Sequence, residues 1–243
     1  MNFDAIRVVL VATTHSGNIG SAARAMKTMG LSSLYLVAPK CEIDEQAYAM
    51  ASGADDVLRQ AVVTTNLPDA LQDCHLVFAT SVRPRDIDLQ GVTPSQCAQK
   101  TREGLISKHR IAIIFGREHA GLTNEELLQS HYHVTIPTNP SFSSLNLAQS
   151  VQVIAYEIRK ELLDPPQILK EPASDLATAD QVAGFYQHLE ETLVAIGFLD
   201  TLSPKRLMQR LRRLFNRTQL EPREVNILRG ILKSIQKKTP GDV

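Results

Sequence analysis

Buried-strand patterns alternate with helical patterns through residues 1–162, and this alternation constrains the fold more than any other feature of the chain. The candidate strands are short and nearly continuous in apolar, often β-branched residues, which is typical of strands buried on both faces of a sheet. Strands that alternate with helices predict an α/β domain on a mainly parallel sheet. The predicted strands are Ile6–Ala12, Leu34–Ala38, Val62–Thr64, Leu76–Thr80, Ile111–Phe115 and His133–Ile136.

Four loops that follow predicted strands carry polar residues that a sheet does not need. These loops begin at Thr13, Thr80, Gly116 and Pro137. Ligands of open α/β sheets bind at the carboxyl ends of the strands. We therefore expect a binding site where the four loops meet.

The stretch Ile136–Arg159 joins the last predicted strand to a long helix through a loop rich in serine, asparagine and proline. Leu147, Val151, Ile154 and Ile158 have the spacing of one apolar helix face. Free backbone N–H groups at the start of this helix could hold the polar atoms of a ligand. The alternative is that the loop only caps the helix, through Ser144 or Asn146.

The loop after the first strand leads into a helix predicted over Ile19–Met29, with Asn18 as its cap and Gly30 as its terminator. It lacks the GxGxxG pattern of dinucleotide-binding loops. Arg24 lies in this helix among alanines, which leave its long side chain free to reach along the loop. An ordinary surface arginine is the alternative.

The loop after Ile111–Phe115 places Arg117 and Glu118 directly at the end of a predicted strand. Thr123 and Glu126 have the T-x-x-E spacing of a capping box, which explains the polar end of this loop without any function. It does not explain Gly116, Arg117 and Glu118, where a cation and a carboxylate lie at the carboxyl end of a strand. Two arginines, Arg83 and Arg85, follow the strand that ends at Thr80, and arginines at several strand ends together favour a functional site.

A proline-rich stretch divides the chain after the α/β region. Three prolines within DPPQILKEP cannot continue the preceding helix, so we predict a linker over 163–177 between a domain over 1–162 and a helical module over 178–243. Helices are predicted near Ala179–Gly197, Pro204–Asn216 and Pro222–Lys237.

Basic residues concentrate in this helical module although the whole chain has no net charge. Residues 178–243 hold eleven basic and seven acidic side chains, and six cations fall in KRLMQRLRRLFNR, over Lys205–Arg217, with no acid among them. Leu207, Leu211 and Leu214 give the same segment an apolar face. Such a run is often only a solvated helix face, but the asymmetry favours contact with phosphate groups.

Composition favours an ordinary globular protein of the cytosol, with 43% hydrophobic residues and an N-terminal apolar run too short for a signal peptide or a membrane span. Cys41, Cys74 and Cys97 are widely spaced and odd in number. They predict free thiols rather than a disulfide framework or a zinc site, and we expect no metal and no function for them.

Three segments in order resemble the motifs of the SpoU/TrmH branch of the SPOUT RNA 2′-O-methyltransferases. They are NIGSAAR (18–24), FGREHAGLTNEE (115–126) and IPTNPSFSSLNLAQSVQVIAYE (136–157). With the helical tail, the resemblance covers nearly the whole chain.

The resemblance implies a fold and a cofactor. The fold would be an α/β SPOUT domain whose C-terminal part forms a trefoil knot, followed by a small all-α module. The knot would bind S-adenosylmethionine (AdoMet) in a bent form, largely through backbone groups. The implied cofactor-binding residues are Thr80, Ser81, Val82, Gly116, Ile136, Ser143, Ser144 and Leu145.

The same resemblance implies the reaction and its residues. The substrate would be the ribose 2′-OH of a cytidine or uridine at position 32 of a tRNA anticodon loop. The family's catalytic set matches Asn18, Arg24, Glu118, Ser144 and Asn146, with Arg24 either as the base or as a clamp on the adjacent phosphate. A guanidinium stays protonated well above neutral pH, which weighs against the first role.

The implied partners are tRNA and a second copy of the chain, since each site of the homodimer would be completed by the other subunit. The residues predicted to contact tRNA phosphates are Arg83, Arg85, Lys205, Arg206, Arg210, Arg212, Arg213 and Arg217. The same chemistry on another RNA is the first alternative. A Rossmann-type oxidoreductase is disfavoured by the missing glycine pattern, and a non-catalytic RNA-binding module is disfavoured by Asn18, Arg24 and Glu118.

Overall fold

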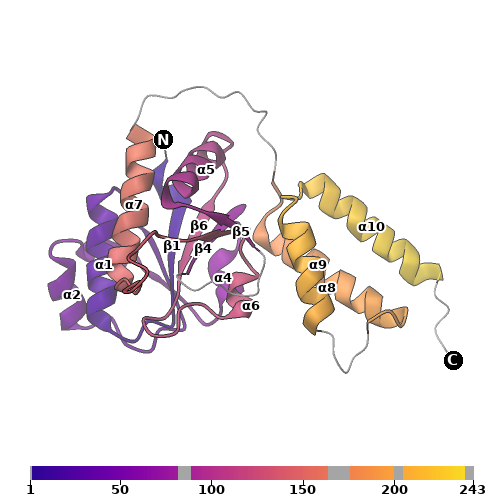
Figure 1. Cartoon of the computed structure of the whole chain (residues 1–243), viewed down its shortest axis with the longest axis horizontal. Helices are drawn as coiled ribbons and strands as arrows, with labels where there is room; N and C mark the ends of the chain where they lie inside the picture. Colours follow the sequence, from indigo (N-terminus) through magenta and orange to yellow (C-terminus); the bar gives the residue numbers. More distant parts are fainter. Residues whose placement is uncertain (1, 82–88, 164–175, 200–204, 239–243) are drawn as a thin grey trace.

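A seven-stranded parallel sheet forms the centre of the larger of the two bodies of the molecule (Figure 1). The computed structural model describes residues 2–81, 89–163, 176–199 and 205–238, without the Lys205 side chain. All six strand pairings in this described part are parallel, in the order β3-β2-β1-β6-β4-β7-β5. The strands are β1 (Ile6–Val11), β2 (Ser33–Val37), β3 (Val62–Thr64), β4 (Leu76–Thr80), β5 (Gln90–Val92), β6 (Ile111–Phe115) and β7 (Tyr132–Val134).

The structure confirms the predicted α/β class and all six predicted strands, with two corrections. Strand β5 was missed, because three residues with a central glycine give no apolar alternation to detect. The last predicted strand extends too far, since β7 ends at Val134 and Ile136 lies in the loop beyond it. The trefoil knot stays a prediction, because strand order and pairing do not establish how the chain is threaded.

Helices cover both faces of the sheet. The helices of this region are α1 (Ser16–Thr28), α2 (Glu45–Ala51), α3 (Asp55–Arg59), α4 (Leu67–Leu71), α5 (Pro94–Ile106), α6 (Asn124–Leu127) and α7 (Leu147–Leu163), after the 3-10 turn η1 (Phe3–Ala5). Val8 and Leu10 of β1 pack with α1, α2, α3, α5 and α7 on one face. Val9 and Val11 pack with α4 and α6 on the other face. Period-two alternation therefore divides each strand between two cores.

Three further helices form a second body at the C-terminal end of the chain: α8 (Ala179–Ala195), α9 (Lys205–Asn216) and α10 (Pro222–Lys238) (Figure 1). They enclose a core of their own, in which Phe185 packs edge-on against Phe215 with ring centroids 4.9 Å apart. Leu214, predicted on the apolar face of its helix, is instead 41% exposed.

Specific hydrogen bonds join the second body to the sheet domain. The Ala179 N–H donates to the Cys74 carbonyl at 2.7 Å. Asn216 Nδ2 donates to the carbonyls of Leu128 and Ser130, at 3.0 and 3.2 Å, and Asn216 Oδ1 accepts from the Tyr186 hydroxyl at 2.6 Å. Because Asn216 ends α9, this buried amide fixes the helix against the loop that precedes β7.

The described residues contain no helix long and apolar enough to cross a membrane, and no group of three or more potential metal ligands. The three cysteines are free thiols, as predicted. Burial raises the pKa of Cys74 to about 11 and that of Cys97 to about 12, so both thiols stay protonated and unreactive at neutral pH.

Candidate functional site

The four loops singled out in the sequence meet at one edge of the sheet. Strands β1, β6, β4 and β7 are neighbours in that order and all run parallel, so their carboxyl ends lie side by side. The loops after these strands begin at Thr13, Gly116, Thr80 and Pro137. This topology confirms that the polar segments come together.

The loop after β6 folds back sharply on itself at Gly116. A Cβ atom on Gly116 would lie 2.2 Å from the carbonyl carbon of Gly121, so no other residue fits this position without moving the loop. Arg117 pairs with Glu126 through two bonds of 2.9 Å, and the capping box of Thr123 with Glu126 is present as predicted. The loop is therefore rigidly held, and Glu118 projects from its folded part.

A cavity of about 200 Å³ lies between the loops after β4, β6 and β7. It is lined by seven of the eight residues predicted to bind the cofactor, namely Thr80, Ser81, Gly116, Ile136, Ser143, Ser144 and Leu145. The eighth, Val82, lies outside the described residues. Hydroxyl and backbone groups line one part of the cavity, and Val134, Ile136 and Leu147 give it apolar walls, which is the mixture expected of a small-molecule site.

A hydrogen-bonded chain of three predicted catalytic residues lies beside this cavity. Asn18 Nδ2 donates to Glu118 Oε1 at 3.0 Å, and Asn146 Nδ2 donates to Asn18 Oδ1 at 2.9 Å. Asn18 was predicted to cap its helix, and this was wrong. Helix α1 begins two residues earlier, at Ser16, and the Asn18 side chain bonds to Glu118 instead. Gly30 follows the end of α1 with a φ of 83°, as the prediction of a glycine terminator requires.

Glu118 is held as a carboxylate. Burial raises its pKa, but the hydrogen bonds from Asn18 and from the backbone and hydroxyl groups of Thr14 outweigh burial and leave the pKa below its usual value. Four donor contacts occupy its two oxygens. Glu118 is therefore suited to fixing the Asn18 amide and poorly suited to accepting a proton.

The loop before α7 performs both of the duties that the sequence left open. Asn146 Oδ1 accepts a 2.9 Å hydrogen bond from the Ala148 N–H and so caps α7, while Ser144 lines the cavity. Within one loop, the asparagine orients the helix and the adjacent serines face the space for a ligand.

Arg24 lies on the other side of the asparagine pair, in a second cavity of about 670 Å³ formed by α1, α2 and the start of α7. The same cavity is lined by Asn18 and Asn146. Arg24 is exposed, which fits both a side chain that reaches along the loop and an ordinary surface arginine. The three asparagine and glutamate side chains thus separate the Arg24 cavity from the smaller one.

The predicted tRNA-contacting arginines of α9 divide into two groups. The first group is exposed, and its spacing places it along one face, called here the arginine face. It consists of Arg206, Arg210 and Arg213 of α9 and of Arg217, which directly follows the helix. Arg212 faces the opposite way, with its guanidinium 4.7 Å from the centroid of the Tyr186 ring. Arg83 and Arg85 lie outside the described residues, as does the Lys205 side chain.

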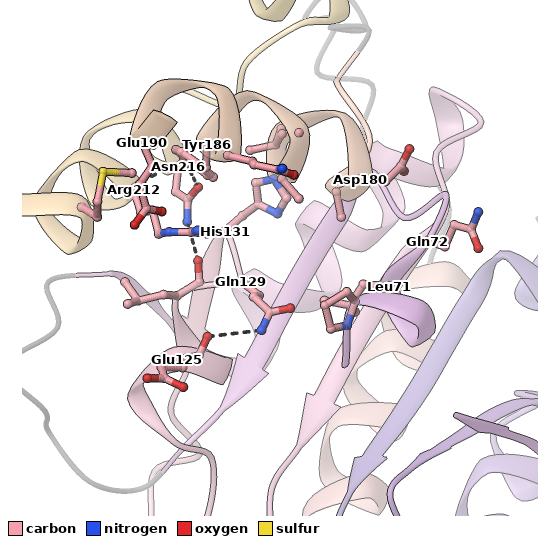
Figure 2. Close-up of a pocket in the computed structure, with 18 of the residues that line it drawn as sticks. Leu71, Gln72, Glu125, Gln129, His131, Asp180, Tyr186, Glu190, Arg212 and Asn216 are labelled. Atoms are coloured by element: carbon pink, nitrogen blue, oxygen red, sulfur yellow. Dashed lines mark hydrogen bonds between the residues drawn. The ribbon is translucent and has the colours of Figure 1, made fainter. Parts of the chain in front are cut away.

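Arg212 lines a larger cleft, of about 840 Å³, between the sheet domain and the helical body (Figure 2). In this view Tyr186, Arg212 and Asn216 come from the helical body, whereas Gln129 and His131 come from the loop before β7. The cleft also carries the carboxylates of Asp69, Glu125, Asp180 and Glu190. This acidic lining repels phosphate. None of the four exposed arginines described above lines the cleft.

Two histidines at the same edge of the sheet were not predicted as site residues from the sequence. His15 lines the Arg24 cavity, His119 lines the smaller cavity, and their ring centroids are 6.4 Å apart. Both were visible in the sequence, because His15 lies shortly before the first motif and His119 directly follows Glu118. Only the pairing of the two loops shows that they face each other.

Comparisons with known proteins agree with this geometry. Residues 5–156 match the SpoU rRNA Methylase family, and residues 180–242 match the C-terminal domain of the tRNA methyltransferase TrmJ. The tRNA (cytidine/uridine-2′-O-)-methyltransferase TrmJ of Pectobacterium atrosepticum is 49% identical over 96% of this chain and 98% of its own.

Two solved structures extend the comparison. The crystal structure of TrmJ from Z. mobilis has a TM-score of 0.84 and 35% identity, over 95% of this chain and 98% of that one. The methyltransferase AviRb from Streptomyces viridochromogenes, solved with its cofactor AdoMet, shares the fold at a TM-score of 0.50 and 22% identity, over 64% of this chain and 60% of its own.

Proposed function

The chain belongs to the SpoU methylase family and groups with the TrmJ tRNA methyltransferases, and from this premise we propose that it methylates the ribose 2′-OH of cytidine or uridine at position 32 of the tRNA anticodon loop. The methyl donor is AdoMet. The enzyme acts in the cytoplasm, as a homodimer. The same chemistry on another tRNA position or on ribosomal RNA is the alternative that the experiment below separates.

The observation that carries this proposal is the hydrogen-bonded chain Glu118–Asn18–Asn146, which lies between a small-molecule cavity and an exposed arginine. A ribose hydroxyl needs to be aligned with the donor methyl group and to lose one proton. These hydrogen bonds fix the Asn18 and Asn146 amides between the cavity for the methyl donor and the Arg24 cavity, where the ribose hydroxyl would lie. Neither a dinucleotide site nor a simple RNA-binding surface needs such an arrangement.

The residues around the smaller cavity fit AdoMet by their chemistry. Val134, Ile136 and Leu147 offer apolar walls for an adenine ring, and the serines of the 143–145 segment offer hydroxyl and backbone groups for polar atoms. When bound, AdoMet supplies a methyl group already activated by its sulfonium. Thr80, Ser81, Val82, Gly116, Ile136, Ser143, Ser144 and Leu145 hold it.

Arg24, Asn18 and Ser144 position the ribose. The Arg24 guanidinium binds the phosphate next to the target nucleotide through its planar set of N–H donors. Asn18 is held by Glu118 and Asn146 in a single orientation and directs the 2′-OH, together with the Ser144 hydroxyl. Fixed amides and hydroxyls lower the entropic cost of alignment, which is the main barrier for a donor that is already activated.

The arginine face, made of Arg206, Arg210, Arg213 and Arg217, contacts tRNA phosphates beyond the target nucleotide, together with Lys205, Arg83 and Arg85. Phosphate contacts of this kind set the register of a protein on its RNA. The helical module over 178–243 thus supplies affinity, and the domain over 1–162 supplies the chemistry.

A second copy of the chain packs against the surface formed by α1 and α7. This surface carries the Arg24 cavity and exposes Tyr156 of α7, which is 53% accessible, and it is flanked by Met50 of α2, which is 48% accessible. Apolar side chains around a polar cavity are a composition common to interfaces between subunits. Each site would then be completed by residues of the partner.

Mass spectrometry of tRNA treated with the protein and AdoMet tests this function. We expect one ribose methylation, at position 32, that is absent without AdoMet. Methylation elsewhere in tRNA or in ribosomal RNA would select the alternative substrate. Failure to bind AdoMet by calorimetry, with and without tRNA, would exclude the methyltransferase altogether.

A further inference from the structure

The geometry points to the facing imidazoles of His15 and His119 as the group that accepts the proton of the ribose 2′-OH. This inference rests on the proposed methyltransferase function and names a residue pair to which the motifs above assign no role. His15 precedes α1 and its side chain makes no capping bond, and His119 lies in the loop after β6. Their rings meet edge to face, with centroids 6.4 Å apart and planes at 81°.

The histidine pair lies where the two cavities meet. His15 lines the Arg24 cavity and His119 lines the smaller cavity, so the pair spans the boundary at which the hydroxyl and the donor methyl group would meet. Both imidazoles are exposed, and within the described part of the chain no hydrogen bond occupies their ring nitrogens. An imidazole with a free nitrogen can take a proton at neutral pH.

Three other titratable groups near the pair, among the described residues, are poorly suited to act as the base. Glu118 accepts four donor contacts and its pKa is lowered, so it gains little by taking a proton. Arg24 carries a guanidinium, whose five N–H groups are donors and which has no acceptor to offer. The Cys41 thiol, whose Sγ lies 3.6 Å from the Thr13 carbonyl oxygen, has a pKa raised by burial and then by Glu118 and Asp44, so it too is protonated.

A lone pair of the 2′-oxygen forms the new O–C bond, while the C–S bond breaks and its electron pair returns to sulfur, giving a neutral thioether. The hydroxyl proton passes to a ring nitrogen of the pair, giving an imidazolium. Charged groups surround the pair on several elements. Arg24 of α1 lines the same cavity as His15, and Arg117 and Glu118 line the same cavity as His119. Asp44, before α2, is hydrogen-bonded to Ser16, the residue after His15. Glu118 stabilises the imidazolium as it forms.

Single-turnover methyl transfer, measured against pH with saturating AdoMet and tRNA, tests the pair. We expect the wild-type rate to rise with pH and then level off at a plateau. The double variant His15→Asn/His119→Asn should lower this plateau by about 10²-fold or more, and its pH–rate profile should no longer show the change of slope. The single variants show which ring accepts the proton. His75→Asn is the matched control, because His75 stacks on His109 in another imidazole pair, 4.9 Å apart, away from the site.

Binding measurements separate this inference from the function on which it rests. The double variant should bind AdoMet and tRNA with the dissociation constants of the wild-type protein. If the wild-type protein transfers no methyl group to tRNA, the proposed function itself is excluded. A double variant that keeps both its rate and its change of slope would overturn the histidine pair, and so would one that loses only tRNA affinity, since that result would make the pair a phosphate contact.

Discussion

Asn146 donates a 2.9 Å hydrogen bond to Asn18, although the two residues lie 128 positions apart in the chain. Asn18 in turn donates to Glu118 at 3.0 Å, so three separate segments share one row of side chains. A row of this kind transmits no charge, but it removes the freedom of each amide to rotate. The site is therefore organised before any ligand binds.

Arg24→Ala should reduce methyl transfer by about 10²-fold or more while leaving AdoMet affinity unchanged, because Arg24 lies outside the smaller cavity. Arg24→Lys keeps the positive charge and loses the planar set of N–H donors. Its activity relative to Arg24→Ala would therefore show how much of the Arg24 contribution comes from charge and how much from the guanidinium geometry. Single-turnover kinetics and calorimetry measure the two quantities. Near-normal turnover of Arg24→Ala would remove Arg24 from the mechanism.

Glu118→Gln should slow methyl transfer and destabilise the fold by about 1 kcal/mol, since a partly exposed carboxylate loses its charge-assisted bonds. The lowered pKa of Glu118 means that its contribution to stability is complete above the ordinary carboxyl pKa and is lost as pH falls through the folded-state value. The difference in unfolding free energy between wild type and variant should therefore shrink at acid pH. A difference that does not change between neutral and acid pH would contradict this account.

Gly116→Ala should weaken AdoMet binding, because the added Cβ would lie 2.2 Å from the carbonyl carbon of Gly121 and would displace the loop that lines the cavity. Overpacking of this kind costs about 1–3 kcal/mol. Gly91→Ala in β5 is the matched control, since nothing lies within 4 Å of its added Cβ. Calorimetry should show reduced affinity for the first variant alone.

Replacing Arg206, Arg210, Arg213 and Arg217 together with glutamine should weaken tRNA binding and flatten its dependence on salt, by about 0.7–0.9 in slope for each phosphate that the variant no longer neutralises. The control removes four exposed cations of α10, namely Arg223, Arg229, Lys233 and Lys237, and so makes the same change in charge elsewhere on the module. Binding titrations at several salt concentrations compare the two. Equal slopes for both variants would show that the arginine face has no special role.

Asn216→Leu should destabilise the junction between α9 and the sheet domain by about 2–4 kcal/mol, because buried carbonyls of Leu128 and Ser130 lose their donor. Thermal unfolding measures the loss. Gln209→Ala, at another position that lines the cleft, should be nearly neutral. We expect AdoMet affinity to survive in Asn216→Leu while tRNA affinity falls, as the arginine face is no longer held in place.

The sequence alone determined the sheet class, six of the strands and the helices that flank the site, because apolar periodicity is a local property that survives without tertiary context. It also indicated which loops meet, since parallel strands bring their carboxyl ends to one edge. Periodicity failed at β5, where three residues with a central glycine show no pattern.

Tertiary structure decided which side chains pair across those loops. Asn18 looked like a helix cap, because a cap is the commonest local role for an asparagine at a helix start. Only the folded sheet offers it Glu118, one hundred residues away. In the same way, Arg212 contacts the Tyr186 ring, whereas Arg210 and Arg213 of the same helix are exposed. Spacing in the sequence predicts which face of a helix carries a residue. The partner of its side chain depends on segments that are distant in the chain.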